Sequence, residues 1–145
     1  LDSLSLALNA IEGTEGVSVI AVSSVYETKP QGFVAQPDFL NLAVLVESEL
    51  SPLELMKQTQ AIETELGKKK LFLNGPRAID IDLLFAEGSV SNTPVLTLPH
   101  PRMLERAFVL IPLAEIWREP APLPPISKEI EQQGCVRVFD PITIT

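Results

Sequence analysis

The run Gly75–Phe85, with the sequence GPRAIDIDLLF, constrains this chain more than any other segment. Aliphatic residues alternate with Asp80 and Asp82. Such alternation predicts a β-strand, here over residues 78–85, with both acids on one face. Two carboxylates about 6–7 Å apart on one strand face can reach the same small cluster of cations. The alternative is that both aspartates lie on the solvated outer face of an edge strand.

Length and composition predict a soluble, single-domain protein. The chain has 145 residues, of which 46% are hydrophobic, enough for one adequate core. No apolar run approaches the ~20 residues of a membrane span. The net charge of −8 argues against a nucleic-acid partner. The single cysteine, Cys135, cannot form an internal disulfide and fits a reducing cytoplasm, where we expect the protein to act.

Helical and strand patterns alternate along the chain. Ser51 and Glu54 form a capping-box pattern, which predicts that a helix begins there. Helices are expected at residues 2–11, 52–66 (ended by Gly67), 108–116 (alternatively from Pro112) and, weakly, 126–133. Strands are expected at residues 17–25, 39–50, 78–85 and, as an edge, 136–139, with long loops at 27–37 and 68–75. This order predicts an α+β fold, in which helices pack on a mixed sheet.

The positive charge of the chain is concentrated in two places. Lys68, Lys69, Lys70 and Arg77 fall close together, and Arg102 and Arg106 flank the only histidine, His100. No glycine-rich phosphate loop is present, so side-chain cations and metal ions would have to hold any phosphates. Paired carboxylates with nearby cations suit Mg²⁺ and phosphoryl transfer. The alternative for the lysines is a solvated loop.

Four sequence pieces occur in a recognisable order. They are SSVYET at 23–28, QPDFLN at 36–41, GPRAIDID at 75–82 and LTLPH at 96–100, the last followed by Arg106 and Phe108. Together they resemble the 6-hydroxymethyl-7,8-dihydropterin pyrophosphokinase family of folate biosynthesis. Two departures stand out: the family's first strand is expected to be absent here, and lysines replace the arginines that often occupy the nucleotide-side loop.

The resemblance implies a fold and an activity. The fold would be a ferredoxin-like α/β sandwich with a mixed, mostly antiparallel sheet, formed by residues 1–145 as one pyrophosphokinase domain. The activity would be transfer of diphosphate from the co-substrate ATP to a reduced pterin, with release of AMP and with two Mg²⁺ ions. We expect a monomer whose partners are these small molecules, with no membrane and no nucleic acid.

The resemblance also implies roles for individual residues. Asp80 and Asp82 would bind both metal ions and, with Arg77 and Arg106, would form the catalytic set. The residues implied to bind ATP are Glu63, Lys68, Lys70, Arg77, Thr97, His100 and Arg106. The residues implied to bind the pterin are Thr28, Phe39, Asn41 and Phe108, with the two phenylalanines stacking on its faces.

Two other hypotheses compete with this one. The first is a non-catalytic relative that binds a pterin or a nucleotide without turnover. The second is an unrelated ferredoxin-like regulatory domain, for which the aspartates would be ordinary surface.

Overall fold

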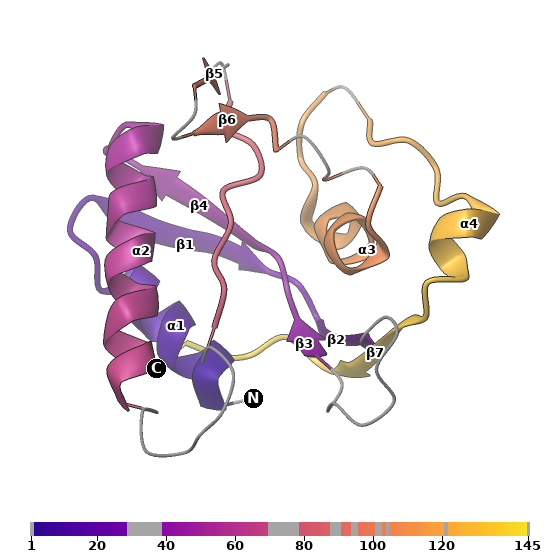
Figure 1. Ribbon diagram of the computed structural model, residues 1–145, viewed down its shortest axis with the longest axis horizontal. Coiled ribbons are helices and arrows are strands. Elements are labelled where there is room, and N and C mark those ends of the chain that lie inside the picture. The colour runs from indigo at the N-terminus through magenta and orange to yellow at the C-terminus, as the bar shows by residue number, and fades with distance from the viewer. Residues whose placement is uncertain are drawn as a thin grey trace. The chain divides into compact units, whose positions relative to one another are not determined.

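A computed structural model describes most of the chain and mixes helices with antiparallel strands (Figure 1). The described residues are 2–28, 39–69, 79–87, 91–93, 96–100, 103, 105–120 and 122–144. They belong to two compact units, the first made of Leu1–Val19, Val46–Pro101 and Thr143–Thr145 and the second of Ile20–Leu45 and Arg102–Ile142. The prediction of an α+β fold is confirmed. Within the described residues, no helix is both long and apolar enough to cross a bilayer.

The first unit contains two helices that pack on each other, α1 (Asp2–Glu12) and α2 (Pro52–Lys69). Buried side chains of α1, among them Leu8, and Leu66 of α2 contribute to its core. The predicted capping box is present: Glu54 N donates to Ser51 Oγ at 3.2 Å, and Ser51 N donates to Glu54 Oε1 at 3.4 Å. These bonds satisfy two backbone donors that have no partner within the helix.

The two long strands of the prediction are each interrupted. Residues 17–25 were expected to form one strand and 39–50 another, but the structure has β1 (Val17–Val22), β2 (Val25–Thr28), β3 (Phe39–Asn41) and β4 (Val44–Ser48). The interruptions face each other: Ser23 N donates to Ala43 O at 2.9 Å, while Ala43 N donates to the Ser23 hydroxyl oxygen at 2.8 Å. A serine side chain thus replaces a backbone partner and ends the regular ladder.

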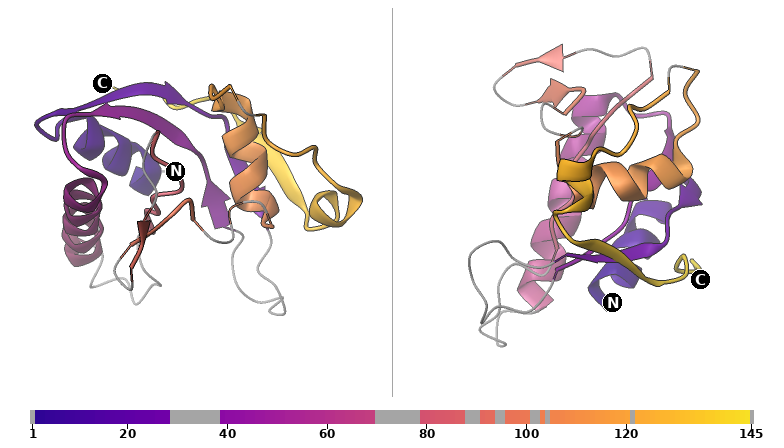
Figure 2. Two further views of the ribbon diagram at one scale, coloured as in Figure 1. Left: turned by 90° about the horizontal axis from the view of Figure 1, so that it is seen from above. Right: turned by 90° about the vertical axis from the view of Figure 1, so that its right-hand side faces the viewer.

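β1 and β4 form a two-stranded sheet and run in opposite directions (Figure 1). The second unit holds a three-stranded antiparallel sheet in the order β3-β2-β7, with β7 at Cys135–Phe139. The predicted edge strand at 136–139 is therefore confirmed. The helix α3 (Ala107–Ile116) contacts all three strands (Figure 2). It begins at Ala107 and contains Pro112, so the alternative start at Pro112 is wrong.

The predicted ends of other elements need correction. Gly67 was expected to end the second helix, but α2 continues through it to Lys69, so Lys68 lies in a helix and not in a loop. Glu27 and Thr28 belong to β2, although a loop was expected from residue 27. The expected helix at 126–133 is reduced to the short α4 (Lys128–Glu131). A small hairpin, β5 (Ser91–Asn92) with β6 (Thr97–Leu98), completes the described elements.

Candidate active site

The acidic segment of the first unit is extended but forms no regular strand. The prediction of a strand over 78–85 is wrong for residues 79–85, none of which has a strand assignment, and Ala78 lies outside the described residues. The expected alternation is nevertheless present: Asp80 and Asp82 are exposed, whereas Ile79 and Ile81 are half-buried. Both acids are therefore presented outward by a segment whose aliphatic side chains partly anchor it.

Hydrogen bonds to α2 and to His100 help to hold this segment, which forms no regular strand. Ile81 N donates to Glu63 Oε2 of α2 at 2.7 Å. Three residues further on, Leu84 O accepts a bond from His100 N at 2.7 Å. The backbone between these bonds carries Asp82, and Asp80 directly precedes the first of them. Glu63 and His100, which the family resemblance implies for the nucleotide side, thus lie beside the segment that carries the predicted metal ligands.

Thr97 lies in the β5–β6 hairpin of the same unit. Its backbone pairs with Asn92, and its hydroxyl donates to Thr93 O at 3.4 Å. The remaining residues expected to bind ATP from this part of the chain cannot be placed in the same way. Arg77 and Lys70 lie outside the described residues, and Lys68 is placed only by its backbone, in the last turn of α2.

Two carboxylates are a small ligand set for a metal ion. Among the described residues, no group of three or more His, Cys, Asp or Glu side chains is placed to hold a metal. Mg²⁺ in phosphate-binding sites commonly takes only one or two carboxylates and completes its octahedral shell with water and phosphate oxygens. The exposed Asp80 and Asp82 offer oxygen ligands of that kind. Their chemistry and number therefore fit Mg²⁺ held jointly with a phosphate substrate.

Three residues expected to bind the pterin lie together in the second unit. Thr28 of β2 pairs with Phe39 of β3, and Tyr26 pairs with Asn41. The Asn41 side-chain amide donates to the Thr28 hydroxyl at 3.2 Å, and Thr28 is buried. For Phe39 the structure describes only the backbone. The two polar groups therefore form one hydrogen-bonding pair at the end of the β2–β3 hairpin.

Phe108, also expected to bind the pterin, lies in the first turn of α3. Arg106, at the N-cap of this helix, places its guanidinium carbon 5.5 Å from the centre of the Phe108 ring. This is a cation–π distance. An aromatic face and a cation from the predicted set are thus brought together at the start of α3.

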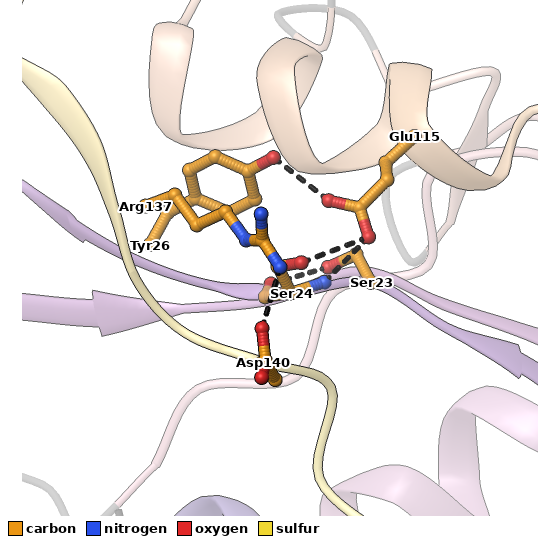
Figure 3. Close-up of polar contacts among 6 residues, drawn as sticks. All are labelled: Ser23, Ser24, Tyr26, Glu115, Arg137 and Asp140. Atoms are coloured by element: carbon orange, nitrogen blue, oxygen red, sulfur yellow. Dashed lines mark hydrogen bonds and ion pairs between the residues drawn. The ribbon is translucent and has the colours of Figure 1, made fainter.

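A polar network that the sequence did not predict lies in the same unit (Figure 3). The carboxylate of Glu115, on α3, accepts bonds from Ser24 N at 2.8 Å, from the Ser24 hydroxyl at 3.1 Å and from the Tyr26 hydroxyl at 2.8 Å. Ser24 immediately precedes β2 and Tyr26 lies within it, so the two side chains that bond Glu115 are only two residues apart in the chain. Nothing in the sequence linked them to Glu115, because the contact joins residues that are far apart in the chain.

This network shifts the pKa of both ionisable members. Burial, followed by the hydrogen bond to Glu115 and its negative charge, raises the pKa of Tyr26 to about 12. Partial burial alone would raise the pKa of Glu115, but the hydrogen bonds from Tyr26 and Ser24, with the charge of Arg137, lower it below its usual value. Both shifts favour an ionised carboxylate that accepts a bond from a neutral phenol.

The thiol of Cys135 plays no comparable part. It is a free cysteine on β7, opposite Thr28 in the sheet. Burial raises the pKa of this thiol, which disfavours the reactive thiolate.

Comparisons with known proteins bear on this arrangement. A model of the family described as 7,8-dihydro-6-hydroxymethylpterin-pyrophosphokinase (HPPK) matches residues 1–118. Two bacterial proteins named 2-amino-4-hydroxy-6-hydroxymethyldihydropteridine pyrophosphokinase are similar to the chain. That of Bacillus subtilis is 46% identical over 123 residues, which are 85% of this chain and 72% of that protein. That of Aquifex aeolicus is 40% identical over 143 residues, covering 95% and 88%.

The folic acid synthesis protein fol1 of Schizosaccharomyces pombe is also similar, at 42% identity over 112 residues. The match covers 77% of this chain but only 15% of that much longer protein. It therefore concerns one part of the fungal protein.

Proposed function

The chain belongs to the 7,8-dihydro-6-hydroxymethylpterin-pyrophosphokinase family, and we propose that it transfers diphosphate from ATP to the hydroxymethyl group of 6-hydroxymethyl-7,8-dihydropterin. The products are the pterin diphosphate and AMP, and the reaction is a step of folate biosynthesis. The chain is thus a pyrophosphokinase, and ATP is its co-substrate.

One observation supports a binding site for the ATP phosphates in the first unit. Asp80 and Asp82 are exposed on a segment that is hydrogen-bonded to Glu63 and His100. In this proposal the two aspartates would hold two Mg²⁺ ions. Bound Mg²⁺ would neutralise charge on the polyphosphate. Glu63 contributes by fixing the backbone between the aspartates, since its carboxylate accepts the Ile81 N–H.

Cationic and hydroxyl side chains complete the proposed nucleotide side. Arg77, His100 and Arg106 would bind phosphate oxygens, with Thr97, Lys68 and Lys70 as further contacts to ATP. Arginine suits this task because its planar fork can donate two parallel bonds to a phosphate. Diphosphate transfer needs several such groups, because negative charge is spread over many oxygens in the transition state.

The pterin would bind through groups of the second unit. Phe39 and Phe108 would stack on the flat heterocycle, and Asn41 and Thr28 would bond its polar edge. The contact of Arg106 with Phe108 supports this assignment, because it places a cation beside the ring against which the substrate would lie. A pterin stacked on Phe108 would then lie next to a positive charge.

We also propose that the chain forms a single ferredoxin-like α/β domain that acts as a monomer in the cytoplasm. The antiparallel β3-β2-β7 sheet and the helix packed on it are compatible with such a sandwich. A free cysteine is compatible with a reducing compartment.

The direct test is formation of AMP that depends on both the reduced pterin and Mg²⁺. We expect AMP only when ATP, Mg²⁺ and the hydroxymethyl pterin are all present, with the pterin diphosphate formed in equal amount. No AMP above background would contradict a catalytic role. Ligand-dependent thermal shifts without turnover would instead support the non-catalytic binding protein.

A further inference from the structure

We propose that Glu115 is a positioning residue for the pterin: it holds α3 against β2 and so sets where Phe108 lies relative to the Thr28–Asn41 pair. The inference rests on the proposed function, because it concerns the affinity of the same pterin site. It goes beyond that function by assigning a positioning role to a carboxylate that is not proposed to contact substrate.

The contacts of Glu115 are short and converge on the start of β2, where Ser24 immediately precedes the strand and Tyr26 lies within it. One carboxylate oxygen accepts both the backbone N–H and the hydroxyl of Ser24, and the other accepts the Tyr26 hydroxyl (Figure 3). The bond from Ser24 N supplies the acceptor for a buried backbone N–H. Ser24 lies in the interruption between β1 and β2, is only 2% exposed, and its N–H would lose its acceptor if Glu115 were removed. A buried donor without an acceptor costs more free energy than an ordinary hydrogen bond contributes.

The position of Glu115 along α3 makes the network relevant to Phe108. Glu115 follows Phe108 by seven residues, or about two helical turns, so the two side chains project from similar sides of the helix. Fixing the Glu115 end against the strand limits rotation and sliding of α3. Since α3 also contacts β3, such movements would shift Phe108 relative to the strand that carries Asn41.

On the strand side, β2 links the Glu115 network to the Thr28–Asn41 pair. Ser24, Tyr26 and Thr28 are alternate residues, and Tyr26 and Thr28 therefore project from the same face of β2. The first two bond Glu115, and the third bonds Asn41. One face of a short strand thus joins the helix that carries Phe108 to the polar pair expected to bond the pterin edge.

The test compares four variants of the full chain. Glu115→Ala removes all three acceptor contacts, and Tyr26→Phe removes one of them. Glu115→Gln is the conservative rescue, because its amide oxygen can accept from Ser24 while its amide nitrogen donates to the Tyr26 hydroxyl oxygen. Glu129→Ala is the matched control, since it deletes an exposed carboxylate of α4 in the same unit.

Calorimetry gives two dissociation constants for each folded variant: that of 6-hydroxymethyl-7,8-dihydropterin with a non-hydrolysable ATP analogue and Mg²⁺ present, and that of the analogue alone. We expect Glu115→Ala to weaken pterin binding roughly tenfold, as for loss of a hydrogen bond to a charged group. Tyr26→Phe should weaken it about threefold, while Glu115→Gln and Glu129→Ala should resemble the parent protein. Analogue binding should be unchanged in all four.

Unchanged pterin affinity in both Tyr26→Phe and folded Glu115→Ala would overturn the inference. Equal weakening of pterin and analogue binding would also overturn it, because that is the result of general destabilisation. If Glu115→Ala does not fold, Tyr26→Phe decides the matter by the same criterion. If the parent protein does not bind the pterin, the proposed function itself is refuted. If the parent protein binds the pterin and the variants bind it equally well, only the role of Glu115 is refuted.

Discussion

The carboxylate of Glu63 accepts the backbone N–H of Ile81 at 2.7 Å, and Ile81 separates Asp80 from Asp82. A helix side chain therefore controls the backbone between the two proposed metal ligands. The arrangement matters because residues 79–85 form no regular strand, so the bond from Ile81 to Glu63 supplies a restraint that a strand ladder would otherwise give.

Removing Glu63 should therefore affect the nucleotide side. We expect Glu63→Ala to raise the dissociation constant of Mg·ATP about tenfold, because a charged hydrogen bond that orders the acidic segment is lost. Glu63→Gln should have a smaller effect, since its amide oxygen can still accept the Ile81 N–H. Titration calorimetry measures both, with Glu65→Ala as the control because Glu65 is an exposed residue of the same helix. Equal losses in Glu63→Ala and Glu65→Ala would contradict the role.

Replacement of either aspartate should abolish most activity without unfolding the protein. We expect Asp80→Ala and Asp82→Ala each to lower turnover by about two orders of magnitude or more, because a ligand of a catalytic metal is removed. Both residues are exposed, so the thermal midpoint should change little. Steady-state AMP formation and thermal unfolding, measured on the same preparations, check the two halves of this prediction. Retention of full turnover in both variants would exclude the assigned role.

Phe108→Ala should discriminate between the two substrates. An aromatic stacking partner for a flat heterocycle contributes about 0.5–1.5 kcal/mol beyond the area it covers, so pterin affinity should fall about tenfold or more. ATP affinity should fall less. The small loss of ATP affinity would arise because Arg106, a proposed phosphate-binding residue, would lose its contact with the Phe108 ring. A larger effect on ATP than on the pterin, by calorimetry, would refute the stacking assignment.

The single tyrosine of the chain allows a direct measurement of the Glu115 contact. The pKa of Tyr26 is raised to about 12, by burial and by Glu115, so the folded state favours the protonated phenol. The stability that this provides is fully present below the unfolded pKa near 10 and is lost as pH rises toward 12. Ultraviolet absorbance of tyrosinate should show this late titration, and Glu115→Gln should move it toward lower pH while the protein remains folded.

The pKa of Glu115 is shifted in the opposite direction to that of Tyr26, so its stabilising effect is lost at low pH and not at high pH. Its lowered pKa means that its stabilising effect is present above the usual carboxyl pKa of 4.5 and is lost as pH falls below that value. An unshifted tyrosinate titration in Glu115→Gln would show that the bond in Figure 3 does not control Tyr26.

The capping box of α2 makes a prediction about stability alone. Ser51→Ala removes the acceptor of the Glu54 N–H and should cost about 1 kcal/mol, which corresponds to a fall of about 2–4 °C in the thermal midpoint for a chain of this size. Ser18→Ala, at an exposed position of β1, is the control. Substrate dissociation constants should be the same in both variants, since neither residue belongs to the proposed site.

Local patterns predicted those features that depend on neighbours in the chain. The start of α2 was predicted because the capping box joins Ser51 to Glu54, three residues away. The placement of Asp80 and Asp82 on the side opposite Ile79 and Ile81 was predicted, because alternation alone determines which side chains of an extended segment share a face. The interruptions of the strands were missed, because the bond between the Ser23 hydroxyl and Ala43 N joins two distant segments.

The sequence by itself therefore determined the chemical groups of this protein, their order, and the helical or extended character of the segments that carry them. It also indicated the family, because the motifs consist of particular residues at fixed spacing and can be recognised without a structure. Only the tertiary structure decided that Glu63 and His100 bond the acidic segment although it forms no regular strand, and that Glu115 joins α3 to β2. The physical reason is that a hydrogen bond depends on where folding brings its donor and acceptor. When the two residues are far apart in the chain, no periodic pattern in the sequence indicates that they will be in contact.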